Sequence, residues 1–321
     1  MIFPWQENQW QQLQVAKKQE RLPHALLLTG LNGTGKSIFA DAFSRMMLCS
    51  QPAQNGLPCN ECHPCRLIIG RAHPNVLWVE PEKEGQAIKV DQIREVSEFV
   101  SQSSMRGEYR MVIITPANNM NTNAANALLK TLEEPASGAM LILISHQSAG
   151  LPATILSRCQ RVAFPMPPKT QALNWLQGQV EQDAALLLNL ANGAPLAALK
   201  LKEGDTLEIR KELFQGLSAL SNKQADPLKL ATKLQSHEPL MLIDFFLTWT
   251  MDILRLQLGD HNIINQDHND ELNALTTRIK LDKTNKLMVY LQQLRGQLYS
   301  GLNLNKQLLL ENALLRWMEC L

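Results

Sequence analysis

Eight residues early in the chain match the pattern of a phosphate-binding loop. They read G-L-N-G-T-G-K-S from Gly30 to Ser37, which satisfies G-x-x-x-x-G-K-[S/T] in full. The apolar run 25–29 before the loop predicts a buried strand, and 36–48 after it predicts a helix. In such a loop, backbone N–H groups and the helix N-terminus hold the phosphates, Lys36 reaches the β- and γ-phosphates, and Ser37 holds Mg²⁺. We therefore expect a phosphate site formed by Gly30, Gly33, Gly35, Lys36 and Ser37.

Hydrolysis of a nucleotide in this loop would also require an acidic side chain at the end of a second buried strand. The strand predicted at 111–114 ends instead at Thr115 and Pro116. From residue 110 to residue 132 the chain has no Asp or Glu, and Glu133 and Glu134 come only after a predicted helix. The sequence therefore favours a loop that can hold ATP or ADP without hydrolysing it, and it leaves open whether nucleotide is bound at all.

Four of the six cysteines lie close together and follow the spacing C-x9-C-x2-C-x2-C. Four sulfur ligands at this spacing can surround a tetrahedral Zn²⁺ with Zn–S distances of about 2.3 Å. In a cytosolic chain, clustered cysteines favour a metal site over disulfide bonds. Four protein ligands leave no open coordination position, so the role is structural. We expect one Zn²⁺ bound by Cys49, Cys59, Cys62 and Cys65.

The composition is that of an ordinary globular protein. The 321 residues are enough for two or three domains, and a hydrophobic share of 45% with a charged share of 19% argues against wholesale disorder. The net charge of +1 excludes a strongly basic surface averaged over the chain. No apolar stretch approaches the ~20 residues that span a bilayer, and we see no secretion signal. We therefore expect a cytoplasmic protein with no membrane partner.

Apolar runs alternate with helical patterns up to about residue 165, and this alternation predicts an α/β fold with a parallel sheet covered by helices. The predicted strands are 25–29, 76–79, 111–114, 140–144 and 161–164. The run P-M-P-P at 165–168 ends the pattern, and only helical patterns follow it. We expect a first domain at 1–165 with the cysteine module at about 49–65, a small helical domain at 166–205, and an all-helical domain at 206–321.

Several motifs together resemble the δ′ subunit family of bacterial DNA polymerase III clamp loaders, which belongs to the AAA+ class. They are L-P-H-A-L-L at 22–27, the four-cysteine insertion, N-A-A-N-A-L-L-K-T-L-E-E-P at 123–135, and S-R-C at 157–159. The resemblance is strong to about residue 200 and weaker beyond. It implies a P-loop AAA+ domain with a zinc-binding insertion, a small helical lid domain, and a helical C-terminal collar that holds five subunits in a ring.

The ATP-hydrolysing motor subunits share most of these motifs, but this chain departs from them. No acidic residue follows 111–114, Leu196 stands where the motors carry a nucleotide-sensing arginine, and the long extension of some motors is missing. The resemblance therefore implies a subunit of a DNA polymerase holoenzyme that is not an ATPase on its own. The complete phosphate loop keeps one alternative open, an ATP-hydrolysing motor subunit.

In this family, the arginine of the S-R-C motif completes the ATP site of a neighbouring motor subunit. The resemblance therefore implies that Arg158, between Ser157 and Cys159, is an arginine finger that acts in trans. We expect Cys159 to be buried, and Arg158 to lie near the sheet edge at which ligands bind. The implied partners are the γ/τ motor subunits and the δ subunit in a hetero-pentameric ring, which loads the sliding clamp onto primed DNA during replication.

Overall fold

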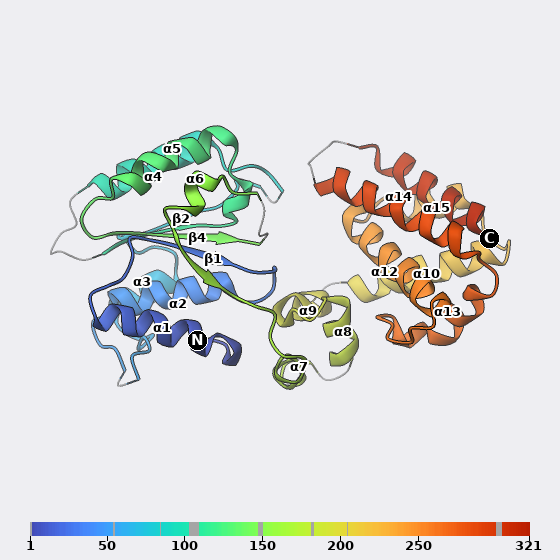
Figure 1. Cartoon of the computed structure of the whole chain (residues 1–321), viewed down its shortest axis with the longest axis horizontal. Coiled ribbons are helices and arrows are strands. Elements are labelled where there is room, and N and C mark those ends of the chain that lie inside the picture. The colour runs from blue at the N-terminus through green and yellow to red at the C-terminus, as the bar shows by residue number, and fades with distance from the viewer. Residues whose placement is uncertain are drawn as a thin grey trace. The chain divides into compact units, whose positions relative to one another are not determined.

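The computed structural model describes residues 2–53, 55–83, 85–102, 109–146, 150–180, 183–203, 205–299 and 304–321. The chain forms two compact units, residues 1–172 and 173–321. The sheet and its helices make up the first unit, and helices make up the second (Figure 1). The finer division into a lid domain at 166–205 and a collar domain at 206–321 stays a prediction.

A five-stranded sheet, all of whose paired strands are parallel, forms the centre of the first unit. Its order is β2-β3-β4-β1-β5, and each predicted strand is present within about one residue of its expected bounds. The strands are β1 (Ala25–Thr29), β2 (Val76–Val79), β3 (Arg110–Ile114), β4 (Ala139–Ser145) and β5 (Gln160–Ala163). Ligands of such sheets bind beyond the carboxyl ends of the strands, which is where the loop after β1 lies.

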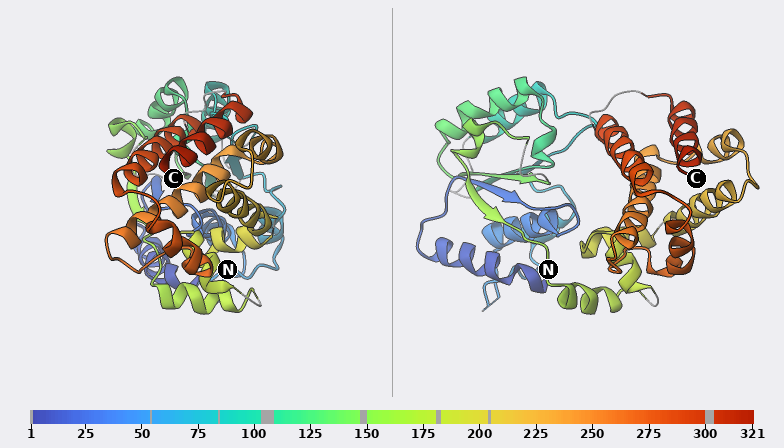
Figure 2. Two further views of the ribbon diagram at one scale, coloured as in Figure 1. Left: turned by 90° about the vertical axis from the view of Figure 1, so that its right-hand side faces the viewer. Right: turned by 45° about the vertical axis from the view of Figure 1, so that its right-hand side comes forward.

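Helices cover both faces of this sheet, as Figure 2 shows from two further directions. Alternate residues of β1 point to opposite faces: Leu26 and Leu28 pack with α1 and α2, whereas Leu27 packs with α4 and α5. Both faces are therefore apolar, as expected for a buried parallel strand. The helices are α1 (Glu7–Lys18), α2 (Lys36–Leu48), α3 (His63–Ile69), α4 (Val90–Ser101), α5 (Thr122–Glu133) and α6 (Ala153–Leu156), with the short turns η1 (Pro4–Gln6) and η3 (Ala117–Asn119).

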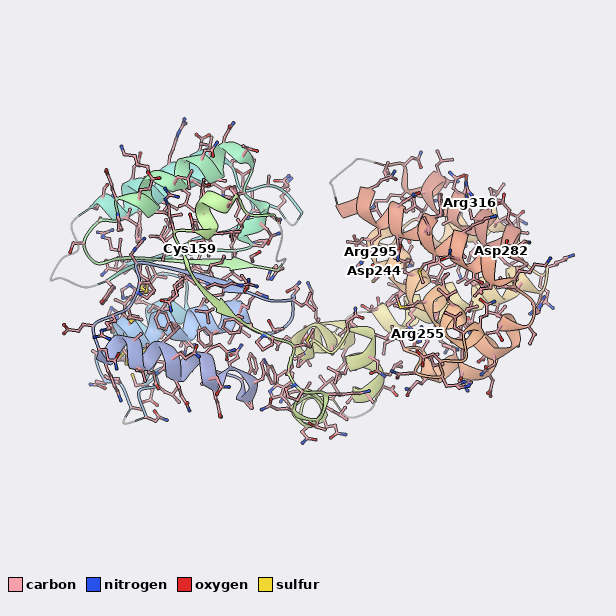
Figure 3. The ribbon with its side chains drawn as sticks, in the orientation of Figure 1. Cys159, Asp244, Arg255, Asp282, Arg295 and Arg316 are labelled. Atoms are coloured by element: carbon pink, nitrogen blue, oxygen red, sulfur yellow. The ribbon has the colours of Figure 1, made fainter. Side chains whose placement is uncertain are left out.

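The described part of the second unit contains helices and no strand. Its core surrounds α12, where Trp249 is buried, and Trp317 of α15 donates a hydrogen bond from Nε1 to the carbonyl oxygen of Leu217 at 3.1 Å. Asp244 and Arg295, labelled in Figure 3, form an ion pair of 2.6 Å between α12 and α14. Helix α7 (Lys169–Gln177) includes the boundary at residue 172, and the helices after it are α8 (Ala184–Leu190), α9 (Pro195–Lys202), α10 (Thr206–Ser221), α11 (Pro227–Leu234), α12 (Pro239–Gln257), α13 (Asn269–Thr276), α14 (Leu281–Tyr299) and α15 (Lys306–Cys320), with the turn η4 (Gln266–His268).

Among the described residues, no single helix is both long and apolar enough to cross a membrane; α8 and α9 reach that composition only together, across a bend of 111°.

Candidate functional site

The phosphate loop joins β1 to α2, and its backbone has the conformation that the glycines of the motif permit. Gly33 and Gly35 have φ of +81° and +88°, in the region that favours glycine. A Cβ atom at Gly35 would lie 2.7 Å from Nε2 of Gln6, so the position also has no room for a side chain. Helix α2 begins at Lys36, directly after this glycine, and its first N–H groups therefore face the loop. The loop has the shape that a phosphate group requires.

Lys36 is almost completely buried and points back into the loop. Its Nζ donates hydrogen bonds to the carbonyl oxygens of Gly30 and Leu31 at 2.6 and 2.7 Å. Burial lowers the pKa of Lys36 to about 8, because the charged form loses hydration. Ser37, in the first turn of α2, is half-buried. The five predicted residues of the loop are therefore brought together in one place.

The N-terminal segment packs against the loop, a contact that the motif did not indicate. Trp5 Nε1 and Gln6 Nε2 both donate to the carbonyl oxygen of Thr34, at 3.0 and 2.9 Å. The ring of Phe3 stacks on that of Trp5 with centroids 4.8 Å apart. Trp5 and Gln6 lie 29 and 28 positions before Thr34, so no local spacing pattern could connect them with the loop.

Thr115 and Pro116 follow β3, as the sequence indicated, and the turn η3 continues with neutral residues. Directly after the neighbouring strand β4, the backbone N–H of His146 donates to Asn118 Oδ1 at 3.2 Å. Burial, with a smaller effect from the Lys36 ammonium group, lowers the pKa of His146 to about 4. Its Nδ1 is buried and has no hydrogen-bond partner among the described residues. A neutral imidazole therefore lies close to the loop. The sequence did not indicate this residue, because a single His after a strand has no diagnostic spacing.

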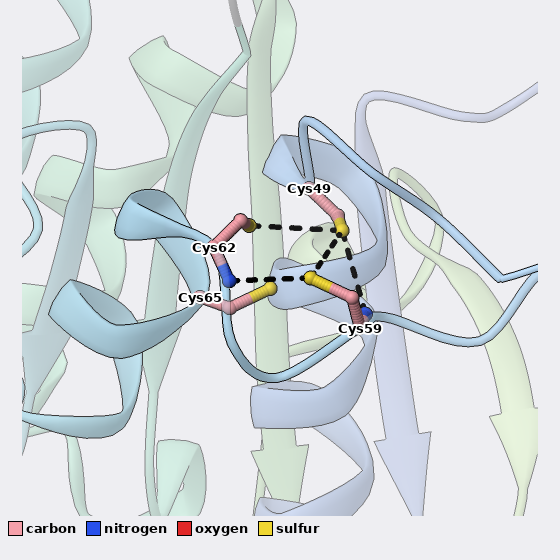
Figure 4. Close-up of side chains that lie close together, drawn as sticks. All are labelled: Cys49, Cys59, Cys62 and Cys65. Atoms are coloured by element: carbon pink, nitrogen blue, oxygen red, sulfur yellow. Dashed lines mark hydrogen bonds between the residues drawn. The ribbon is translucent and has the colours of Figure 1, made fainter.

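The four clustered cysteines converge in space, as Figure 4 shows. Their Sγ atoms all lie within 4.8 Å of one another, and Cys49 Sγ lies 3.5 Å from that of Cys59 and 3.9 Å from that of Cys62. A tetrahedral ion with sulfur at about 2.3 Å requires sulfur–sulfur distances of about 3.8 Å. The cluster therefore fits a structural zinc site.

Backbone and thiol chemistry support the same fit. The N–H group of Cys62 donates to Cys59 Sγ at 3.3 Å, and that of Cys59 donates to Cys49 Sγ at 3.5 Å, so sulfur charge would be stabilised by the turns. Burial disfavours the Cys62 thiolate, but hydrogen bonds with Ser50 and Cys65 outweigh this effect and lower its pKa to about 5. Burial raises the pKa of Cys65. All four sulfurs can carry negative charge together only if a cation compensates them.

Arg158 does not lie at the edge of the sheet where the sequence led us to expect it. Gln160, the first residue of β5, pairs with Leu26 near the start of β1, whereas the phosphate loop follows the end of β1. The chain must return to the amino edge before it can form another parallel strand, and this crossover includes α6 and Arg158. The length of β1, roughly 15 Å, separates the two edges. The expectation of a position at the ligand-binding edge was wrong.

Arg158 is held at this edge by three contacts. Its Nη2 donates to Glu133 Oε1 at 2.6 Å, and its Nη1 donates to the carbonyl oxygen of Thr154 at 2.9 Å and to Ser157 Oγ at 3.4 Å. The Arg158 side chain is 34% exposed, so a partner can still reach the guanidinium group. Cys159, labelled in Figure 3, is buried among the apolar residues of the sheet, as expected.

Comparisons with known proteins show the family of the chain. A family model described as DNA polymerase III, delta subunit matches residues 5–168, and a second model, for the C-terminal part of the delta subunit, matches residues 204–319. The DNA polymerase III subunit δ′ of Pseudomonas aeruginosa is 36% identical over 98% of this chain and 97% of its own length. The chain belongs to the DNA polymerase III δ′ subunit family. Another δ′ relative, from Escherichia coli, is 33% identical over 98% of this chain and 94% of its own.

The fold of this δ′ family member is also found among solved structures. A DNA polymerase III gamma subunit-related protein from Thermotoga maritima matches with a TM-score of 0.51 and 20% identity, over 96% of this chain and 99% of its own. The first unit is thus a parallel α/β domain that carries the phosphate-loop motif and a four-cysteine insertion, and helices form the rest of the described chain.

Proposed function

We propose that this δ′ family member is a non-hydrolysing subunit of a DNA polymerase III clamp loader that supplies Arg158 to the ATP site of a neighbouring motor subunit. The proposal rests on the position of Arg158, which lies at the amino edge of the sheet, on the crossover before β5. From there it is separated from its own phosphate loop by the length of β1. A guanidinium group presents planar, permanently charged donors that match a transferring phosphoryl group.

Hydrolysis in the chain's own loop is not part of this role. The loop has its lysine and glycines, but Thr115 and Pro116 stand where an acidic residue would hold Mg²⁺. Lys36 would hold the phosphates of ATP or ADP and Ser37 the Mg²⁺ that accompanies them, and bound nucleotide would stabilise the loop without being turned over. The complete loop is the one feature that favours the alternative of an ATP-hydrolysing motor subunit. Turnover by the isolated chain would favour that alternative.

The four-cysteine cluster has a structural role in the proposal. Cys49, Cys59, Cys62 and Cys65 would hold one Zn²⁺, and the ion would fix the segment between α2 and α3. All four coordination positions of the ion would be filled by protein sulfur, so the ion would take no part in a reaction.

The proposed partners are the γ/τ motor subunits and a δ subunit in a hetero-pentameric ring, with the sliding clamp and primer-template DNA reached through the complex. The helices from about residue 206 would form the collar, and the role requires a cytoplasmic location.

The experiment that tests the function is reconstitution of the clamp loader with purified motor and δ subunits. We expect the chain to co-purify with them, and clamp loading to require it. Arg158→Ala should leave assembly intact and lower both ATP turnover and clamp loading. Assembly without any effect of Arg158→Ala on turnover would contradict the proposed role of the arginine.

A further inference from the structure

The ion pair between Glu133 and Arg158 joins two segments of the first unit that are 25 positions apart in the chain. Glu133 is the last residue of α5, and Arg158 follows the short helix α6. Helices α5 and α6 lie on the same face of the sheet (Figure 1), and Glu133 Oε1 accepts from Arg158 Nη2 at 2.6 Å. The contact thus links the end of the motif at 123–135 to the S-R-C motif.

The contacts of Arg158 fix its guanidinium group from two sides. Glu133 binds Nη2, and the carbonyl oxygen of Thr154, one helical turn before the arginine, binds Nη1. No hydrogen bond from Nε is found among the described residues. An arginine side chain has several rotatable bonds, and holding both terminal nitrogens removes most of their freedom. The guanidinium plane is thereby oriented while donors remain available for an anion.

The same pair contributes little to folding. The side chains of Arg158 and Glu133 are 34% and 50% exposed, and exposed ion pairs add little to stability. Glu134, the next residue, is also exposed but forms no ion pair in the described part of the chain. Of these two adjacent glutamates, only Glu133 contacts Arg158 in the described part of the chain.

We propose that Glu133 is a positioning residue, whose carboxylate holds Arg158 in the orientation in which it meets the phosphates bound by a neighbouring subunit. This inference rests on the proposed function of Arg158 and adds to it a second residue of the same chain. Orientation before encounter matters because a flexible group must otherwise be ordered during the reaction. The pair should therefore act on the rate of turnover and not on the binding of ATP to the motor.

The test uses the complete reconstituted complex with four variants of this chain: Glu133→Ala, Glu133→Gln, Glu134→Ala and Arg158→Ala. Glu133→Ala should lower the single-turnover rate of ATP hydrolysis at the motor site that Arg158 faces about three- to fivefold, the loss expected from one exposed ion pair, and leave the affinity of that site for ATP unchanged. Glu133→Gln, which keeps an acceptor oxygen, should recover part of that loss. Glu134→Ala is the matched control and should behave as wild type. Circular dichroism and co-purification check that each variant folds and assembles.

A double variant separates positioning from other effects. In the Arg158→Ala background, Glu133→Ala should cause no further loss, because the two residues act as one unit. An equal loss in both backgrounds would overturn the inference. A rise in turnover with Glu133→Ala would also overturn it, because Glu133 would then be keeping Arg158 away from the neighbouring ATP site. If Arg158→Ala lowers turnover and Glu133→Ala does not, only the positioning role fails. If Arg158→Ala itself has no effect, the proposed function fails and this inference fails with it.

Discussion

Arg45 of α2 donates a hydrogen bond from Nη1 to Oδ1 of Asn60, in the turn between two of the clustered cysteines. Arg45 also forms an ion pair with Asp41 at 2.6 Å on the same helix. Helix α2 begins at the phosphate loop, so the Arg45–Asn60 hydrogen bond connects the cysteine module with the element that positions the loop, while Asp41 holds Arg45 from within the helix. The module is thus attached to the P-loop domain through a defined polar contact.

The first prediction concerns the metal. Purified protein should contain about one equivalent of zinc, and Cys62→Ser should abolish binding while the sheet stays folded, because the site fixes a local segment. Elemental analysis and far-UV circular dichroism measure the two effects. Cys320→Ser, at a buried cysteine far along the chain, controls for the loss of a thiol. Less than half an equivalent of zinc in the wild-type protein would contradict the assignment.

A second prediction isolates the connection to α2. Asn60 has φ of +65°, so Asn60→Gly keeps the backbone conformation and removes only the acceptor for Arg45. We expect zinc content to stay the same and the midpoint of thermal unfolding to fall by a few degrees, since one charged hydrogen bond with a partly buried partner contributes about 1.5–3 kcal/mol. An unchanged midpoint would show that the contact does not stabilise the module.

The third prediction follows from the low pKa of His146. The unfolded chain binds a proton at His146 near pH 6.5, whereas the folded chain binds it only near pH 4. The free energy of unfolding should therefore fall as the pH is lowered from 6.5 towards 4, because the unfolded state holds more protons in this window. His146→Gln should flatten this part of the dependence in urea unfolding at pH 6.5 and 5, and His261→Gln, at an exposed histidine, should not. Equal slopes in all three proteins would contradict the prediction.

A fourth prediction concerns ADP and the charge of Lys36. Because the pKa of Lys36 is about 8 in the free loop, the share of chains with a charged lysine falls about tenfold between pH 7 and pH 9. ADP affinity, measured by titration calorimetry, should fall by about the same factor. Lys36→Arg, which stays charged, should show a flat profile. A wild-type affinity that is the same at both pH values would mean that Lys36 does not contact the phosphates.

The local features of this fold could be predicted well from the sequence. Strand β1 could be recognised because all five of its residues are buried, so that it forms an apolar run in the sequence. The cysteine site could be recognised because its ligands lie within seventeen residues. Contacts between distant segments left no such signal, as Trp5 with Thr34 and Glu133 with Arg158 show. Arg158 was expected at the wrong edge because β4 ends at the carboxyl edge of the sheet, and the return of the chain to the amino edge before β5 was not taken into account. In a parallel sheet, that return decides the side on which a residue lies.

In the proposed function, Arg158 acts on a neighbouring subunit and not on its own loop. Single-turnover ATP hydrolysis by the reconstituted complex tests it most directly, with Arg158→Ala, Arg158→Lys and the exposed control Arg94→Ala compared in the same assembly. We predict that Arg158→Ala lowers the rate at one motor site by about 10³-fold, within the range of other arginine fingers. Arg158→Lys should restore little of it, because an ammonium group lacks the planar fork, and Arg94→Ala should have no effect. A wild-type rate at every site with Arg158→Ala would show that Arg158 does not act on a neighbouring subunit.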